Sequence, residues 1–241
     1  MTTSHPQPDD HPEVEVPTIP AATVVPLRDG PDGVETLMLR RSSRLAFAGG
    51  MWVWPGGRVD ELDHVPERPD DLEAAARRAA VREAREESGL LLDERELIWF
   101  AHWTPPPVRM RRFATWFFAT RCPDSDVAVD GGEIEEHRWI TPAEALARRN
   151  ALEIELAPPT WITLEQLRPF RTVSDALQAL SSRPAEHFAT RFARVDGGAV
   201  ALYHGDAGYE TSDATAPGPR HRLWMLDSGW RYERDTDSSA P

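Results

Sequence analysis

The sequence predicts an α/β fold, an α/β/α sandwich followed by a C-terminal β appendage. Three features of the 241 residues favour it. Apolar runs of strand length lie on both sides of a long helical pattern that ends at Ser88, and helical patterns return between residues 141 and 181. After His187 the chain carries only short β-like runs separated by turn residues. Strands between helices on both sides imply a sheet that is covered on both faces.

The elements of the first half follow from alternation, turn residues and caps. The helix that ends at Ser88 takes Asp70 or Asp71 as its N-cap, and Gly89 follows its last turn. Two of the expected strands, Leu97–Thr104 and Phe113–Thr120, are apolar on both faces, which is typical of central positions in a sheet. The strands expected before residue 121 are Thr18–Leu27, Val34–Arg40, Met51–Trp54, Leu97–Thr104 and Phe113–Thr120.

The second half begins with a short strand, Glu136–Ile140, and a capping box with proline at the first helical position, Thr141-Pro142-Ala143-Glu144. Helices are expected over residues 142–149, Thr160–Leu167 and Ser174–Ser181. The appendage strands are expected at Phe188–Val195, Ala199–Tyr203, Arg222–Leu226 and Trp230–Tyr232. We therefore expect a main domain over residues 17–185 and an appendage over 186–234, between disordered tails at 1–16 and 235–241. The appendage is a candidate for homodimer contacts.

Composition excludes several classes of function. A net charge of −13 argues against binding to duplex nucleic acid, which needs a positive surface. All 27 basic residues are arginine, so lysine Schiff-base chemistry and a Walker-type phosphate loop are ruled out. The single Cys122 excludes an internal disulfide. No apolar run is long enough to span a membrane and the first residues do not form a signal peptide, so we expect a cytoplasmic protein.

Three glutamates share one face of the expected helix. At about 100° per residue, Glu83, Glu86 and Glu87 fall within a wedge of roughly 100° that continues the apolar stripe of the helix. Like charges at these spacings destabilise a helix unless a cation lies among them, and hard dications take carboxylate oxygen. Upstream, Gly56 and Gly57 allow a tight turn that brings main-chain carbonyls close to a ligand. Together these features predict a Mg²⁺ or Mn²⁺ site and a phosphate-bearing substrate.

Gly57 followed by Arg82-Glu83-Ala84-Arg85-Glu86-Glu87-Ser88-Gly89-Leu90 resembles the Nudix box, G-x5-E-x7-R-E-U-x-E-E-x-G-U, in which U is bulky and apolar. Gly57 and Arg82 are 25 positions apart where the pattern has 14, so 11 residues are inserted. Counting back from Arg82 places the first glutamate of the box at Ala74, which puts an orienting role in doubt. The insertion, Asp60 to about Asp71, is expected to loop out and to supply no ligands.

The resemblance implies a Nudix-type sandwich with a mixed sheet, and roles for the matching residues. Glu83 and Glu87 would be the most direct metal ligands, with the main-chain carbonyl of Gly56 or Gly57. Glu86 would be shared between the metal and Arg82, whose planar fork matches a carboxylate. The reaction implied is hydrolysis of a nucleoside diphosphate linked to another moiety.

Further candidates are a general base and substrate-binding arginines. The base is Glu83, or an acid of the loop before Trp139, for which Glu133 and Glu136 are the choices. Arginines beside aromatic residues suit a phosphate and a stacked base, although they equally suit a soluble strand end. These arginines are Arg41, Arg109, Arg111 and Arg112.

Residues upstream of the box are similar to the signature of the coenzyme A diphosphatase branch. They are Arg41-Ser42-Ser43-Arg44-Leu45, then Gly50, then Pro55-Gly56-Gly57, without the histidine expected near Ala48 or the acid near Met51. The resemblance favours coenzyme A or acyl-CoA as substrate, while ADP-ribose, NADH or an oxidised nucleotide stay open. Two rivals are a Nudix-fold nucleotide-binding module without catalysis, favoured by Ala74, and an isopentenyl diphosphate isomerase-like enzyme, which would need Cys122.

Overall fold

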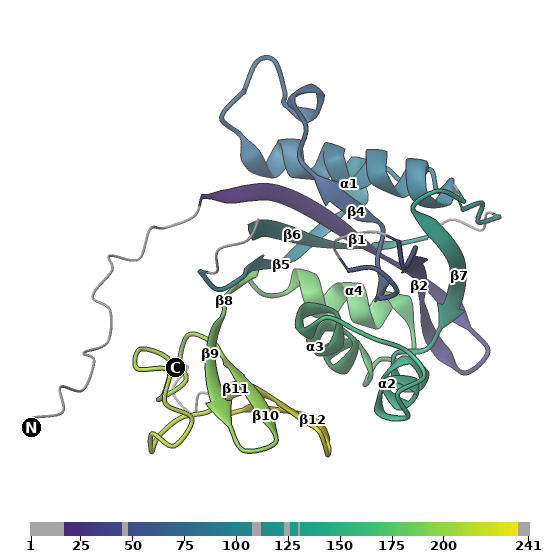
Figure 1. Cartoon of the computed structure of the whole chain (residues 1–241). Coiled ribbons are helices and arrows are strands. Elements are labelled where there is room, and N and C mark those ends of the chain that lie inside the picture. Colours follow the sequence, from purple (N-terminus) through teal and green to yellow (C-terminus); the bar gives the residue numbers. More distant parts are fainter. Residues whose placement is uncertain (1–16, 45–47, 108–111, 123–125, 130, 236–241) are drawn as a thin grey trace, which may run out of the picture.

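The computed structural model describes residues 17–44, 48–107, 112–122, 126–129 and 131–235. The tails expected to be disordered lie outside the described residues except for Asp235, and so do Arg109 and Arg111. The described chain forms a large sheet between helices, with a smaller sheet beside it (Figure 1).

The large sheet has eight strands and is mixed. Its main order is β3-β2-β1-β6-β5-β8, while β4 pairs with β1 and β7 with β2. β1 runs parallel to β6 and β5 runs parallel to β8, whereas the other neighbours are antiparallel. The strands are β1 (Thr18–Gly30), β2 (Gly33–Arg41), β3 (Trp52–Val53), β4 (Gly56–Arg58), β5 (Ile98–Thr104), β6 (Arg112–Arg121), β7 (Ile134–Ile140) and β8 (Glu186–Ala189).

Helices cover both faces of this sheet, so the α/β/α sandwich is confirmed (Figure 1). One face packs against α1 (Leu72–Ser88), whose buried alanines share a core cluster with Ala22 and Val24 of β1. The other face has a core rich in aromatic residues beneath α2 (Pro142–Asn150), α3 (Pro158–Leu167) and α4 (Val173–Ser181). None of the helices in the described ranges is long and apolar enough to cross a membrane.

The ends of α1 follow from its sequence. Asp71 is the N-cap, and its side chain accepts a hydrogen bond from the main-chain N–H of Ala74 at 3.0 Å. Gly89 ends the helix at a φ of 73°, a conformation that a residue with a Cβ rarely adopts. Because small alanines face the sheet, the helix lies close to it, and the last turn reaches the Gly56-Gly57 turn.

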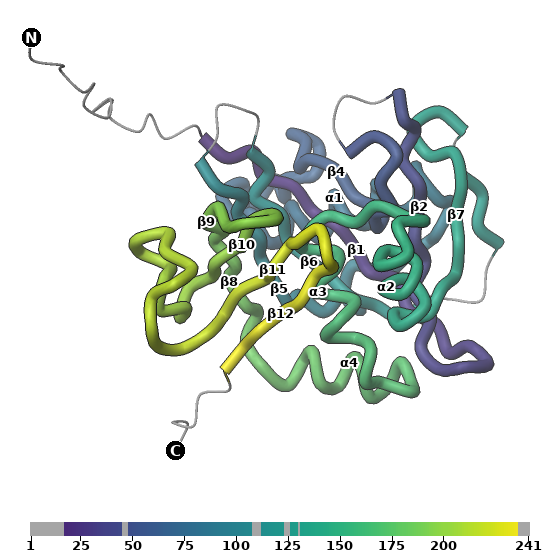
Figure 2. The backbone as a smooth tube through the Cα atoms, turned by 60° about the horizontal axis from the view of Figure 1, so that its bottom comes forward, coloured from purple at the N-terminus to yellow at the C-terminus, as the bar shows by residue number. Residues whose placement is uncertain are grey.

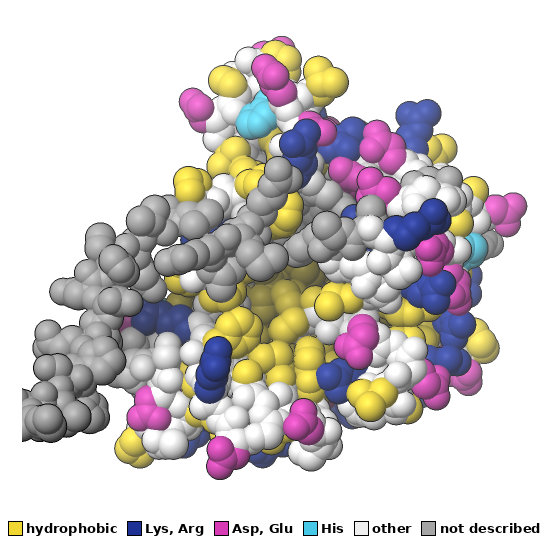
Figure 3. Space-filling model, in the orientation of Figure 1, with side chains coloured by type: hydrophobic (Ala, Val, Ile, Leu, Met, Phe, Trp, Pro, Cys, Tyr) yellow, Lys and Arg dark blue, Asp and Glu magenta, His cyan; other side chains and the backbone are white. Residues whose placement is uncertain are grey.

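The second sheet consists of β9 (Arg191–Val195), β10 (Gly198–Leu202), β11 (His221–Leu226) and β12 (Gly229–Arg234), in the order β12-β11-β10-β9. The single strand expected at Phe188–Val195 is wrong. The chain forms β8 in the large sheet and β9 in the small one, and Thr190 between them donates a hydrogen bond to the Thr104 carbonyl at 3.0 Å. Leu223 of β11 and Tyr203, directly after β10, belong to the core on the α2–α4 side. Figure 2 shows the second sheet on the same side of the molecule as α3 and α4, and Figure 3 shows hydrophobic side chains gathered at the middle of the molecule.

A buried ion pair anchors the connection between β10 and β11. The carboxylate of Asp206 and the guanidinium of Arg222 are both fully buried, and two hydrogen bonds of 2.6 and 2.7 Å join them. Arg222 also donates to the Ala214 carbonyl at 2.6 Å. The connection is therefore fastened to the second sheet by charge as well as by packing.

Candidate active site

The last turn of α1 meets β4 at the Gly56-Gly57 turn, as the sequence predicted. The main-chain N–H of Gly56 donates a hydrogen bond to Glu87 Oε2 at 2.9 Å. The Glu83 carboxylate lies so close to Gly57 that a Cβ at this position would overlap it. A Cβ at residue 57 would therefore displace the flexible Glu83 side chain, whereas a Cβ at residue 56 would overlap the main chain of Ala22 and Thr23, so close approach requires glycine at residue 56. The main chain of the turn lies beside two of the three glutamates.

Glu87 is a buried carboxylate with little compensating charge. Its residue is 5% exposed, and Arg41 Nη1 lies 3.6 Å from Glu87 Oε1. Burial raises the pKa of Glu87 to about 8, and the charges of Glu83 and Glu133 add to the rise, while the Gly56 N–H and Arg41 oppose it. Burial likewise raises the pKa of Glu83. Near neutral pH Glu87 therefore keeps its proton in the metal-free protein.

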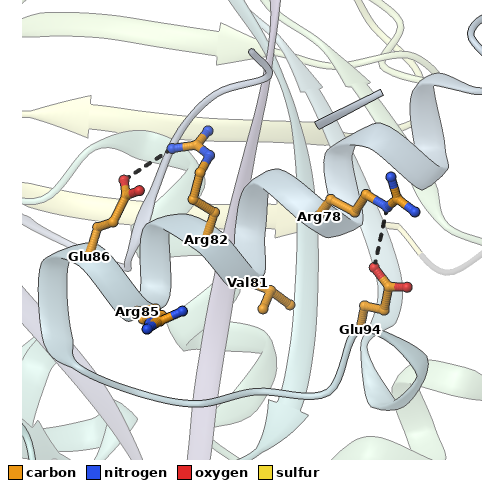
Figure 4. Close-up of a pocket in the computed structure, with 6 residues that line it drawn as sticks. All are labelled: Arg78, Val81, Arg82, Arg85, Glu86 and Glu94. Carbon is orange, nitrogen blue, oxygen red and sulfur yellow. Dashed lines mark hydrogen bonds and ion pairs between the residues drawn. The ribbon is translucent and has the colours of Figure 1, made fainter. Parts of the chain in front are cut away.

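Arg82 is the hub of the carboxylate cluster. Its Nη1 donates to Glu83 Oε1 at 2.8 Å and to Glu86 Oε2 at 3.2 Å. Figure 4 shows Arg82 and Glu86 facing one another along α1, at the edge of a groove that Arg78 and Glu94 close at its other end. The Glu86 side chain is 58% exposed, so it is free to turn toward a ligand.

The residue that holds Arg82 is Asp63, which was not among the residues predicted for the site. Asp63 is buried, and its carboxylate accepts hydrogen bonds from Arg82 Nε at 3.1 Å and Nη2 at 2.9 Å. This contact is the largest cause that raises the pKa of Arg82 above its usual range. Asp63 Oδ2 also accepts from the Asp60 N–H at 2.8 Å, which fixes the carboxylate in the short 3₁₀ turn Glu61–Asp63.

Asp63 corrects the alignment of the box. Five residues separate Gly57 from Asp63, which is the spacing between the glycine and the first acid of the Nudix box. The extra residues therefore lie after this acid, between Asp63 and Arg82, and counting back from Arg82 led to Ala74 for that reason. Glu73, beside Ala74, instead pairs with Arg77 at 2.8 Å. The expectation that the insertion supplies no metal ligands stays a prediction, but Asp63, within the range assigned to the insertion, joins the cluster through Arg82. The spacing of the box, read forward from Gly57, points to this acid.

The rest of the insertion folds back on itself. Val65 and Arg68 form an isolated antiparallel bridge, with the Arg68 N–H 2.9 Å from the Val65 carbonyl. The ring Nδ1 of His64 lies 2.8 Å from the Pro69 carbonyl oxygen. These contacts bring the two ends of the loop together. The loop therefore does not displace α1, and the helix glutamates keep their place in the cluster.

The candidate residues outside the Nudix box lie in different parts of the structure. Glu133 lies at the cluster, with its Oε2 3.2 Å from Arg41 Nη2. Glu136 is on β7, where Arg138 at 3.1 Å and Arg40 at 3.7 Å engage it. Arg112 is buried and donates to the Pro105 carbonyl at 2.8 and 3.2 Å. Glu133 and Arg41 are thus the candidates outside the box whose contacts join the carboxylate cluster.

The donor set fits a hard dication by its chemistry. Carboxylate and main-chain oxygens are the ligands that Mg²⁺ and Mn²⁺ prefer, and a buried, poorly compensated Glu87 is the kind of group that a cation stabilises. In the arrangement described, no three acidic, histidine or cysteine side chains of the described residues converge on one point. Glu83 and Glu86 are turned to Arg82, so metal binding requires these side chains to rotate.

Comparison with known proteins decides the family. Residues 17–164 match the NUDIX domain family. The chain belongs to the Nudix family. Among solved structures, a NUDIX hydrolase from Alicyclobacillus acidocaldarius is 23% identical, with a TM-score of 0.61 over 70% of this chain and 99% of the other. The NUDIX domain of Shewanella oneidensis NrtR, solved with ADP ribose, is 16% identical, with a TM-score of 0.49 over 66% of this chain and 92% of the other.

The family assignment agrees with the site. This Nudix hydrolase has the mixed sheet and helices of the Nudix fold, and the matched segment includes Gly57, Asp63 and all of α1. Nudix hydrolases generally use divalent metal ions, and their reaction is hydrolysis of a diphosphate linkage in nucleotide-type small molecules. The match ends within α3, so α4 and the second sheet lie beyond it. The rival reading without catalysis loses its main support, because Asp63 takes the position assigned to Ala74.

Proposed function

We propose that this protein hydrolyses the diphosphate linkage of a nucleoside diphosphate derivative with Mg²⁺ or Mn²⁺. The observation that carries the proposal is the meeting of Glu83 and the buried Glu87 with the Gly56-Gly57 main chain, with Glu86 joined to Glu83 through Arg82. These carboxylates would stabilise a bound cation, and the cation would neutralise the diphosphate of the substrate.

The residues of the cluster would have different roles in the reaction. Glu83, Glu87 and the Gly57 carbonyl would hold the metal, with Glu86 shared between the metal and Arg82. A bound metal ion lowers the pKa of a coordinated water and neutralises the diphosphate. Arg82, fixed by Asp63, sets the positions of Glu83 and Glu86. The proton of the attacking water is taken by Glu83 or by Glu133, since both lie at the cluster.

For the substrate we propose coenzyme A or an acyl-CoA. Water adds to one phosphorus of the diphosphate, the bridging P–O bond breaks, and the products are 3′,5′-ADP and (acyl-)phosphopantetheine. The support is the resemblance of Arg41-Ser42-Ser43-Arg44 and Pro55-Gly56-Gly57 to the coenzyme A diphosphatase signature. The position of Arg41 agrees with it, because its guanidinium lies beside Glu87 and Glu133, within reach of a phosphate at the cluster. Arg109 and Arg111 are further candidates for phosphate contacts.

A substrate panel tests both levels of the proposal. Coenzyme A, acetyl-CoA, ADP-ribose, NADH and 8-oxo-dGTP are incubated with Mg²⁺, with Mn²⁺ and with a chelator, and products are identified by mass spectrometry in H₂¹⁸O. We expect metal-dependent release of 3′,5′-ADP, with the highest kcat/KM for coenzyme A or acetyl-CoA. A higher kcat/KM for ADP-ribose, NADH or 8-oxo-dGTP would reject the coenzyme A proposal alone. No metal-dependent turnover of any member would reject diphosphate hydrolysis in this class.

A further inference from the structure

A groove separates α2 from the hairpin of the second sheet. Its volume is about 430 Å³, within the range of roughly 300–1,000 Å³ that is usual for small-molecule sites. It lies with α2, on the face of the large sheet opposite to α1 and its glutamates. The polar and aromatic residues that line it include Arg149, Asn150, Trp224, Asp227, Trp230 and Arg231.

Arg149 is a largely buried cation that forms no ion pair within the described residues. The residue is 9% exposed, and within the described ranges its guanidinium has neither a hydrogen bond nor an ion pair. The two other buried arginines of these ranges differ, because Arg222 is paired with Asp206 and Arg112 donates to Pro105. Burying a charge without a partner is costly, so a partner from outside the chain would be stabilising.

Local features keep the guanidinium in place. Arg149 lies in the last turn of α2, where the helix dipole favours a cation. Its Cζ lies 4.0 Å from the centre of the Trp230 ring, a cation–π distance. Burial lowers the pKa of Arg149 while Glu155 opposes the shift, and a guanidinium keeps its charge in either case.

The Arg149 guanidinium has N–H donors available to a ligand, since its Nε has no hydrogen-bond partner in the described part of the chain. A guanidinium that stacks on an aromatic ring uses its face, and its N–H donors point outward in the plane. Paired N–H donors match the two oxygens of a phosphate or a carboxylate. Arg231, which also lines the groove, forms an ion pair with Glu233. Of the two arginines in the lining, Arg149 is therefore the one that forms no ion pair.

We propose that the groove binds a small molecule through an oxyanion, phosphate or carboxylate, held by Arg149. The aromatic walls given by Trp230 and Trp224 add contact area for the body of the ligand. Asp227, which also lines the groove, repels an anion and therefore weakens the site. The site lies apart from the carboxylates of α1, so it does not depend on the proposed hydrolysis.

The test is a titration of the full-length protein with inorganic phosphate and with citrate, followed by tryptophan fluorescence. Ionic strength is held constant and a chelator is present. The E86Q/E87Q variant serves as the parent, so that the site on α1 takes no metal. We expect a saturable change that Arg149→Met weakens at least tenfold, that Asp227→Asn strengthens severalfold, and that R148Q leaves unchanged. Arg148 is the matched control, because it is the adjacent arginine and is paired with Glu144 and Glu153.

Saturation by phosphate alone or by citrate alone supports the proposal and identifies the type of oxyanion. If Arg149→Met does not fold, Arg149→Lys replaces it, because it keeps the charge and loses the fork, and we expect severalfold weaker binding. Equal titrations of parent and Arg149 variant would overturn the proposal, as would the absence of a saturable change with either probe.

Discussion

Asp63 and Arg82 join the two halves of the Nudix box through a pair of hydrogen bonds, 2.9 and 3.1 Å long, across 19 positions of sequence. Burial alone would raise the pKa of Asp63, but the hydrogen bonds from Arg82 and from the Asp60 N–H outweigh it and hold the pKa below its usual range. Arg82, fixed in this way, donates hydrogen bonds to Glu83 and Glu86 and so holds their side chains in place. The position of the glutamates therefore depends on an acid that does not contact them.

Replacement of Asp63 by Asn should lower kcat by about 10- to 100-fold, with a smaller change in KM. The amide cannot accept both hydrogen bonds from Arg82, so Glu83 and Glu86 lose their fixed orientation. Steady-state kinetics on the substrate found in the panel measures the effect. Glu73→Gln is the matched control, because this acid pairs with Arg77, and it should keep at least half of the parent kcat. Equal activities of Asp63→Asn and the parent would show that Arg82 needs no anchor.

Excision of residues 65–68, which joins His64 to Pro69, should keep metal-dependent hydrolysis within about a factor of ten, or about 1.4 kcal/mol in the barrier. The contact between His64 and Pro69 shows that the ends of this loop are adjacent, and Asp63 stays in place. A matched deletion of residues 63–66 removes Asp63 and should lose far more activity. Similar activities of the two deletions, measured on folded protein, would contradict the distinction between Asp63 and the loop.

The stability of the metal-free protein should fall as pH rises from about 4.5 to about 8. The folded pKa of Glu87 is raised to about 8 from an ordinary 4.5, so the folded state holds a proton that the unfolded state releases in this window. Urea unfolding at several pH values, with a chelator present, measures the slope. Glu87→Gln should remove most of it. Over the same window Mg²⁺ affinity should rise with pH, by up to about tenfold per unit, because binding displaces that proton.

A pH-independent stability of the parent between pH 5 and 8, or the same slope in Glu87→Gln, would contradict the assignment of the proton to Glu87. Glu86→Gln is the matched control, because Glu86 is exposed and next to Glu87 in sequence. It should retain the slope of the parent.

Asp206→Ala should destabilise the protein by about 3–5 kcal/mol, the usual cost of leaving one partner of a buried ion pair without the other. Arg222 would remain fully buried with only the Ala214 carbonyl as partner. Arg231→Gln, which breaks a more exposed pair with Glu233, should cost less than about 1 kcal/mol. Chemical denaturation gives both values. A loss below 1 kcal/mol for Asp206→Ala would show that the pair does not hold the β10–β11 connection.

Much of this architecture could be predicted because local signals agree with the tertiary structure. Helical period placed Glu83 and Glu87 correctly on the sheet-facing side of α1, where they extend the stripe of buried alanines. It was wrong for Glu86, which was assigned to the same stripe but has a side chain that is 58% exposed. The Gly56-Gly57 turn lies beside these glutamates, and close approach to the main chain of β1 demands glycine at residue 56. Period and turn chemistry act over a few residues, and sequence carries them directly.

The errors came from choices that only long-range contacts decide. The position of an insertion within a motif is ambiguous from one end, so counting back from Arg82 gave Ala74 and the hydrogen bonds gave Asp63. The division of the expected strand 188–195 depends on β5, which takes β8 as its parallel neighbour and leaves β9 to the other sheet. A run of β-forming residues does not indicate which of the two sheets the strand joins.

The central claim is that the glutamates of α1 form a metal site for hydrolysis, and the double variant Glu86→Gln/Glu87→Gln tests it most directly. The melting temperature is measured with and without Mg²⁺ or Mn²⁺, together with turnover of the substrate found in the panel. We predict that the metal-free variant is at least as stable as the parent, because repulsion at the cluster is removed while the Gly56 N–H keeps an oxygen acceptor. Metal should no longer raise its melting temperature, and hydrolysis should fall by several orders of magnitude. A variant that metal still stabilises and that turns over at near-parent rates would contradict the claim.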